Sequence, residues 1–68
     1  MKPEEKIFFE GKYLAVRSYY NYFINLYLMD EEFYEVWYFR HTNKIEKIEK
    51  LNDEKKLDLY ILSETKKP

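Results

Sequence analysis

Apolar and aromatic side chains alternate with other residues from Lys12 to Arg40, and polar residues interrupt this pattern at two places. Eleven of the fourteen aromatic residues lie between Tyr13 and Phe39. Aromatic and β-branched residues favour the pleated surface of a β-sheet. The interruptions are Asn21 and the acidic run 30–32, which are typical of turns. The pattern therefore predicts three antiparallel strands at 12–20, 22–29 and 33–40.

The length of the two turns decides which side chains share a face, because a slip of one residue exchanges the faces of a strand. Three-residue loops at 20–22 and 30–32 place the aliphatic residues of all three strands together. Two-residue loops would set them beside Arg17, Asn25 or Glu35. We therefore expect three-residue loops and a core on the aliphatic face. The expected core residues are Leu14, Val16, Ile24, Leu26, Leu28 and Val36.

The opposite face of the predicted sheet is both aromatic and polar, which makes it the candidate interaction surface. Its candidate binding residues are Arg17, Tyr19, Phe23, Asn25, Tyr27, Glu35, Trp37 and Phe39. Glu35 is expected one diagonal step from Arg17, so that the two form an ion pair at the surface. Alternatively, a desolvated Glu35 could act as an acid or base.

Residues 44–50, with the sequence KIEKIEK, fit two interpretations. As a helix they would be capped by Asn43, with Ile45 and Ile48 on one stripe. As a strand they follow the preceding strand after a turn-sized gap and put one isoleucine on each face. We favour a fourth strand at the edge of the sheet, where its charges discourage further pairing.

Both ends of the chain are expected to pack on this sheet. Residues 53–64 predict a helix that is capped by Asp53 and lies on the aliphatic face. The apolar residues 7–9 stand before Gly11, a turn signal, and predict a short arm against the sheet. This arm could fold over Trp37 instead of leaving that side chain exposed.

The fold class expected from these elements is α+β, with a three- to four-stranded antiparallel β-meander and a C-terminal helix packed on one face. The 68 residues are expected to form a single small domain with frayed ends at 1–6 and 65–68. A domain of this size buries a limited core. Since the chain has no cysteine, aromatic packing or a second subunit must supply the remaining stability.

Few residues offer catalytic or metal-binding chemistry. The single histidine, His41, lies in a polar turn, and neither Ser18 nor Ser63 can be placed beside it. The acidic run 30–32 matches no ligand loop. We therefore expect no enzymatic activity, no cofactor and no metal.

Charge and hydropathy bear on the class of partner. The 12 basic and 13 acidic residues nearly cancel, which argues against strong attraction to nucleic acid or anionic membrane. No apolar run is long enough to span a bilayer, and the polar start resembles no signal peptide. A cytoplasmic location is expected.

The aromatic face suggests the function, because a large exposed apolar patch usually marks an interface. Our first hypothesis is a small non-catalytic protein-interaction module, most simply a homodimer. The alternatives are a sheet that binds single-stranded nucleic acid through stacked aromatics, or a small ligand-binding domain around Glu35 and Arg17.

Overall fold

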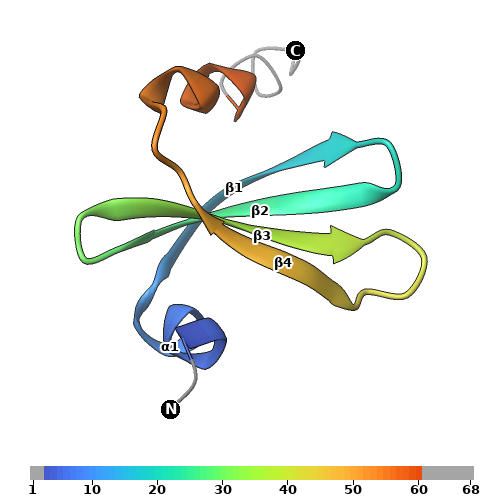
Figure 1. Cartoon of the computed structure of the whole chain (residues 1–68), viewed down its shortest axis with the longest axis horizontal. Coiled ribbons are helices and arrows are strands. Elements are labelled where there is room, and N and C mark those ends of the chain that lie inside the picture. The colour runs from blue at the N-terminus through green and yellow to red at the C-terminus, as the bar shows by residue number, and fades with distance from the viewer. Residues whose placement is uncertain (1–2, 61–68) are drawn as a thin grey trace.

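The structure is a computed structural model that describes residues 3–60 of the chain (Figure 1). Its centre is one antiparallel sheet with the strand order β1-β2-β3-β4. The strands are β1 (Lys12–Tyr19), β2 (Tyr22–Met29), β3 (Glu32–Phe39) and β4 (Ile45–Lys50). The α+β meander is therefore confirmed, and the fourth strand lies at the edge of the sheet as expected. The helical interpretation of residues 44–50 is wrong.

A helix, α1 (Pro3–Glu10), precedes the sheet, so residues 3–6 are helical where we expected a frayed end. Gly11 ends this helix, since its N–H donates to the carbonyl oxygen of Ile7 at 2.9 Å. A Cβ at position 11 would collide with that same oxygen. Glycine is therefore required where the chain leaves the helix and enters β1.

After β4 the chain forms a short 3-10 helix, η1 (Glu54–Leu57), and helical backbone continues through residue 60. The carboxylate of Asp53 accepts a hydrogen bond from the N–H of Lys55 at 2.9 Å, which is the cap expected from the sequence. The predicted residues 61–64 of this helix, and the expected frayed end at 65–68, lie outside the described residues. Figure 1 shows α1 and η1 on opposite sides of the sheet.

Both tight hairpin turns are one residue shorter than expected. Tyr19 pairs with Tyr22, and Met29 pairs with Glu32, so each turn has two residues. The backbone φ angle is positive at Tyr20, at 50°, and also at both residues of the Asp30-Glu31 turn. Such turns match the right-handed twist of the flanking strands. The three-residue loops predicted at 20–22 and 30–32 are therefore wrong.

The shorter turns exchange the faces of β2 relative to β1 and β3. We name the two faces after Trp37 and Tyr38, which are neighbours on β3. The Trp37 face carries Ala15, Arg17, Tyr19, Tyr22, Ile24, Leu26, Leu28, Phe33, Glu35, Phe39, Lys47 and Glu49 besides Trp37 itself. The Tyr38 face carries Tyr13, Val16, Ser18, Phe23, Asn25, Tyr27, Met29, Tyr34, Val36, Ile45, Ile48 and Lys50 besides Tyr38 itself.

The predicted aliphatic core face is consequently split between both faces. Ile24 and Leu26 are buried on the Trp37 face, whereas Val36 is buried on the Tyr38 face with Met29 and Ile7. Leu14 and Val16, which we expected in the core, are exposed. The helical residue Ile7 replaces them, because α1 packs on the sheet where the C-terminal helix was expected.

Candidate interaction surface

The eight predicted binding residues do not form one surface. Five of them, Arg17, Tyr19, Glu35, Trp37 and Phe39, lie together on the Trp37 face as expected. The other three belong to β2 and lie on the Tyr38 face: Phe23, Asn25 and Tyr27. The cause is the two-residue turns, which reverse β2 alone.

A hydrogen-bonded network of three side chains lies on the Trp37 face. Oε2 of Glu35 accepts hydrogen bonds from Nη2 of Arg17 at 3.2 Å and from the Tyr60 hydroxyl at 2.7 Å. Glu35 is only 2% exposed. The predicted pair between Arg17 and Glu35 therefore exists, but it is buried and not at the surface. Tyr60, the third member, was not predicted, because helical periodicity does not say which face of the sheet a helix covers.

The network holds the C-terminal segment on the sheet. Burial raises the pKa of the Tyr60 phenol well above its ordinary value, and the hydrogen bond to Glu35 and its negative charge raise it further. Arg17 acts in the opposite direction. The phenol consequently stays protonated and remains a donor to Glu35 over the physiological pH range.

Trp37 lies beside this network and is contacted by two cations. Nζ of Lys47 lies 4.2 Å from the ring centroid, and Cζ of Arg17 lies 5.8 Å from it. Tyr19 and Tyr22 meet the ring edge-on, with centroids 5.9 and 5.2 Å away. The idea that the N-terminal arm covers Trp37 is wrong, since Ile7 packs on the opposite face. Trp37 is therefore a half-buried part of the fold and not an open platform.

The polar groups of this face are not all paired within the described part of the chain. The indole N–H of Trp37 and Nε of Arg17 are buried, and neither has a hydrogen-bond acceptor among residues 3–60. Burial without an acceptor costs free energy. On the Trp37 face, the hydrogen bonds to Glu35 are therefore accompanied by an unfavourable contribution to stability from two buried donors without acceptors.

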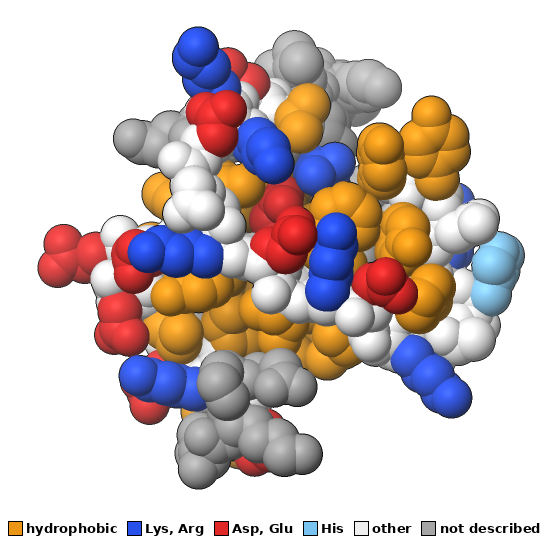
Figure 2. All heavy atoms as spheres, viewed as in Figure 1, with side chains coloured by type: hydrophobic (Ala, Val, Ile, Leu, Met, Phe, Trp, Pro, Cys, Tyr) orange, Lys and Arg blue, Asp and Glu red, His pale blue; other side chains and the backbone are white. Residues whose placement is uncertain are grey.

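The Tyr38 face is covered over only part of its length. α1 packs where Ile7 meets Met29 and Val36, close to the turn between β2 and β3. Beyond α1, Tyr13 near the start of β1, Val16 and, towards the other end of the sheet, Phe23 are exposed. Figure 2 shows hydrophobic side chains at the surface between the sheet and the N-terminal helix.

A hollow of about 340 Å³ lies in this uncovered half, and we call it the open hollow. Its lining consists of Tyr13, Val16, Phe23, Asn25, Tyr38 and Asn43. None of these side chains is charged at neutral pH. Burial and the neighbouring Tyr27 raise the pKa of Tyr38 above its ordinary value, although Asn25 acts in the opposite direction. Two of the predicted binding residues, Phe23 and Asn25, therefore line the open hollow.

Bulges in both edge strands enlarge the apolar part of the Tyr38 face. The register shifts at Leu14 in β1, so that Tyr13 and Val16 lie on the same face although they are three residues apart. The register also shifts at Glu46 in β4, which brings Ile45 and Ile48 to one face. The expectation that the two isoleucines lie on opposite faces is therefore wrong. A bulge inserts one residue and so reverses the alternation beyond it.

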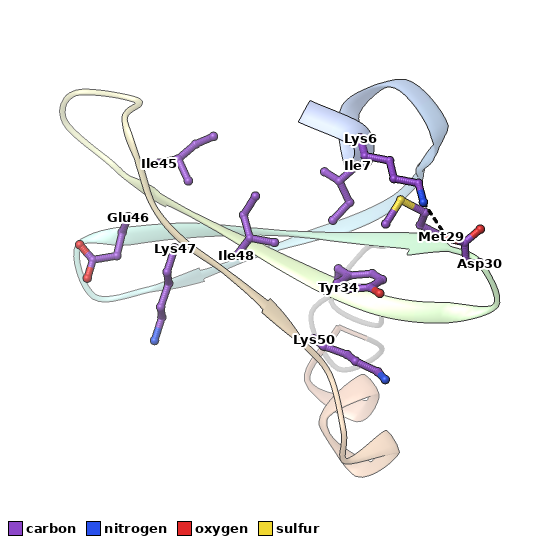
Figure 3. Close-up of a pocket in the computed structure, with 10 residues that line it drawn as sticks. All are labelled: Lys6, Ile7, Met29, Asp30, Tyr34, Ile45, Glu46, Lys47, Ile48 and Lys50. Carbon is purple, nitrogen blue, oxygen red and sulfur yellow. Dashed lines mark ion pairs between the residues drawn. The ribbon is translucent and has the colours of Figure 1, made fainter. Parts of the chain in front are cut away.

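A groove of about 820 Å³ lies beside α1 on the same face (Figure 3). Ile7 from α1, Met29 from β2 and Ile48 from β4 form part of its apolar lining. The ion pair between Lys6 and Asp30, with 3.5 Å between Nζ and Oδ2, joins the helix to the turn that follows β2. The groove arises because α1 stands above the sheet and leaves β4 uncovered.

The acidic run 30–32 is used in ion pairs. Asp30 pairs with Lys6, and Glu32 pairs with Lys50, whose pKa is raised by this contact. Within residues 3–60, no group of three or more histidine or acidic side chains is arranged to hold a metal ion. In the same part of the chain, no helix is long and apolar enough to cross a membrane.

Four residues of the open hollow were not predicted as binding residues. Val16 and Tyr38 were expected on the core side, Asn43 in a turn, and Tyr13 on the aromatic face but outside the candidate set. The signal that could have found them is the general preference of hairpins for two-residue turns. We rejected such turns because they mix aliphatic and polar residues on one face, and the structure contains that mixture. No protein-family model, no curated protein and no solved structure matches this chain, so its function is inferred from its own geometry.

Proposed function

We propose that this protein is a non-catalytic protein-interaction domain that associates with itself through the uncovered half of the Tyr38 face. The observation that carries the proposal is the open hollow, an uncharged concave surface whose apolar residues Tyr13, Val16 and Phe23 are exposed. An apolar surface that remains exposed on a folded chain gains free energy when a partner covers it.

The chemistry of the open hollow favours a protein partner. Tyrosine and phenylalanine are enriched in protein interfaces, and charged residues are depleted at their centres. The amides of Asn25 and Asn43 and the hydroxyls of Tyr13 and Tyr38 each offer donors and acceptors. Such a surface can face a copy of itself across a twofold axis without repulsion between like charges. The absence of cysteine is in keeping with a reducing compartment such as the cytoplasm.

Sedimentation velocity over a concentration series tests this proposal. We expect a dimer at micromolar concentration, and we expect Val16→Glu to weaken the association by about 2 kcal/mol or more if Val16 is a hot spot. The matched control is Leu59→Glu, because Leu59 is 44% exposed and Val16 is 43% exposed, but Leu59 belongs to the C-terminal segment on the other side of the sheet. A wild-type chain that stays monomeric at every concentration would contradict the proposal.

Single-stranded nucleic acid is the second candidate partner, and one observation favours it. Arg40 lies over the ring of Phe23, with Cζ 4.7 Å from the centroid, so a cation and an aromatic side chain are together at the end of the sheet. The fluorescence anisotropy of a labelled single-stranded oligonucleotide, titrated with the protein at low salt, tests this candidate, since Trp37 lies on the opposite face from Phe23 and would not report such binding. Unchanged anisotropy would remove the candidate.

The groove beside α1 supports a third candidate, a small apolar ligand. Its apolar side chains Ile7, Met29 and Ile48 offer a surface that an apolar ligand could contact, and charged side chains such as Lys47 and Lys50 complete the lining. This groove is not the ligand site that we expected around Glu35 and Arg17. The Glu35 carboxylate already accepts hydrogen bonds from Arg17 and from the Tyr60 hydroxyl, so it is not free to bind a ligand. Fluorescence of an apolar dye, compared between the wild type and Ile48→Glu, tests for binding there.

A further inference from the structure

We infer that the partner is a second copy of this chain, docked so that α1 of each copy lies in the open hollow of the other and Phe9 enters that hollow. This inference rests on the proposed self-association and specifies its geometry. It follows from three properties of the Tyr38 face: a projecting aromatic side chain, a hollow that nothing in the described chain fills, and opposite charges beside the two.

The projecting side chain is Phe9, which is 75% exposed. It lies two residues after the buried Ile7, and two residues turn an α-helix by about 200°. Phe9 therefore points away from the sheet on which Ile7 packs. A side chain of this size buries about 150–250 Å² when it is covered, so its exposure on the monomer is unfavourable.

The hollow lies on the same face as α1 and extends towards the opposite end of the strands. α1 packs at the end of β2 that carries Met29, whereas the hollow runs from Tyr13 in β1 to Phe23 at the start of β2 and Asn43 after β3. A twofold axis that runs parallel to the sheet and across the strands, placed between helix and hollow, turns the two Tyr38 faces towards each other and brings each helix over the hollow of the other copy. Because both parts lie on one face, the contact closes at two subunits.

The charges beside the helix and the hollow are complementary. α1 exposes Glu5 and Glu10, while its Lys6 is paired with Asp30. At the rim of the hollow, Arg40 lies over Phe23 and Lys44 follows Asn43. Within residues 3–60, neither Arg40 nor Lys44 takes part in an ion pair. The twofold arrangement brings an acidic helix to a basic rim twice, which favours this orientation over a random one.

A mixing experiment with two complementary variants tests the inference. Phe9→Lys removes the projecting aromatic ring, and Val16→Glu places a carboxylate in the hollow. We expect each variant alone to raise the dissociation constant by about thirtyfold or more, the change typical of a hot spot. An equimolar mixture should again form dimers, because one of its two contacts is intact and the other sets lysine against glutamate. The matched control is Tyr20→Lys, since Tyr20 is 80% exposed in a turn away from α1, and this variant should associate like the wild type.

The outcomes separate the inference from the proposed function. If Val16→Glu is monomeric while Phe9→Lys associates like the wild type, self-association through the hollow stands and the docking of α1 is overturned. If both variants are monomeric and their mixture forms no dimer, the pairing of Phe9 with the hollow is also overturned. A wild-type chain that never associates overturns the proposed function itself.

Disulfide trapping gives a second measurement that does not depend on weakening the dimer. The chain has no cysteine, so the double variant Phe9→Cys with Val16→Cys carries the only two thiols. We expect mild oxidation to give a covalent dimer in non-reducing electrophoresis, since the two positions meet between copies. The control pairs Tyr20→Cys with Val16→Cys and should remain monomeric under the same conditions. Equal yields for both double variants would overturn the inference.

Discussion

The two faces of this sheet are covered in different ways. On the Trp37 face, the C-terminal segment is held by the Tyr60 hydroxyl, which donates to a Glu35 carboxylate that is buried with Arg17. On the Tyr38 face, α1 is held by Ile7, which packs on Met29 and Val36. One cover depends on directional polar contacts, and the other depends on apolar burial.

The difference shows how one small sheet can bury a stable core and still leave part of one face exposed to a partner. A buried ion pair contributes little net stability but is very sensitive to loss of one partner, since the remaining charge is left buried. An apolar contact is less directional, and its contribution follows the area that it covers. α1 covers only part of the Tyr38 face, so the open hollow remains available there. Four variants, ordered by expected effect, test this contrast.

Replacement of Glu35 should have the largest effect. Glu35→Ala leaves Arg17 buried without its partner and the Tyr60 hydroxyl without its acceptor, which should cost about 3–5 kcal/mol. This is comparable with the whole stability of a domain of this size. We expect the variant to be largely unfolded by far-ultraviolet circular dichroism. The matched control is Glu49→Ala, because Glu49 pairs with Glu35 across the strands but is exposed, and it should cost less than about 1 kcal/mol.

Truncation of Ile7 tests the apolar cover. Ile7→Ala should lower the free energy of unfolding by about 2–5 kcal/mol, because Ile7 is fully buried and its loss leaves a cavity beneath α1. Urea unfolding at low protein concentration measures the change. In the same helix, Phe9→Ala should change the stability of the monomer by less than about 0.5 kcal/mol, since Phe9 is exposed. Equal effects of the two variants would show that α1 is not anchored by Ile7.

Removal of the Tyr60 hydroxyl should have an intermediate effect. Tyr60→Phe keeps the ring but loses the hydrogen bond to a charged group, which should cost about 1.5–3 kcal/mol in urea unfolding. Tyr20→Phe is the control, because that hydroxyl belongs to an exposed side chain. A neutral Tyr60→Phe would mean that the aromatic ring alone holds the C-terminal segment.

Tyr60→Phe should also change how the stability of the protein depends on alkaline pH. The pKa of Tyr60 in the folded chain lies above its ordinary value of 10.0, so the unfolded chain ionises first as the pH rises. The contribution of this hydroxyl to stability is therefore complete below pH 10 and is lost progressively at higher pH. We expect the stability of the wild type to fall more steeply above that pH than the stability of Tyr60→Phe. Tyr38 contributes a slope of the same sign to both proteins. Identical slopes would contradict the buried environment of Tyr60.

The smallest effect is expected for an exposed ion pair. Lys6→Ala removes the contact with Asp30 next to the buried Ile7, and it should cost less than about 1 kcal/mol because both side chains are exposed. The difference from the wild type should decrease further at high salt. A larger loss would mean that α1 is held by charge as well as by Ile7, and the contrast between the two faces would weaken.

Local pattern was sufficient to locate the strands and the C-terminal cap. The alternation between Lys12 and Arg40 has a period of two, which depends only on neighbouring residues. Asp53 could be identified as a cap because its side chain bonds to backbone two residues further on. The pair between Arg17 and Glu35 was also predictable, because β1 and β3 keep the same relative parity whether both turns have two residues or three.

The position of Phe23, Asn25 and Tyr27 could not be predicted by the same reasoning. Their face depends on the length of two turns, and a difference of one residue moves all three to the other side. We chose the turn length that gave a purely aliphatic face. The structure instead follows the turn geometry that suits the strand twist and then pairs the resulting buried Glu35 with Arg17 and Tyr60.

The sequence by itself thus determined the first three strands, the cap at Asp53 and the aromatic character of the sheet, since these depend on contacts between near neighbours, whereas it left residues 44–50 open between strand and helix. Only the tertiary structure decided which face each side chain occupies, that α1 and the C-terminal segment lie on opposite sides, and that the open hollow is uncharged. Those properties depend on turn length, on the bulges at Leu14 and Glu46 and on packing between distant segments. A single inserted or omitted residue reverses them, so they are properties of the folded chain as a whole.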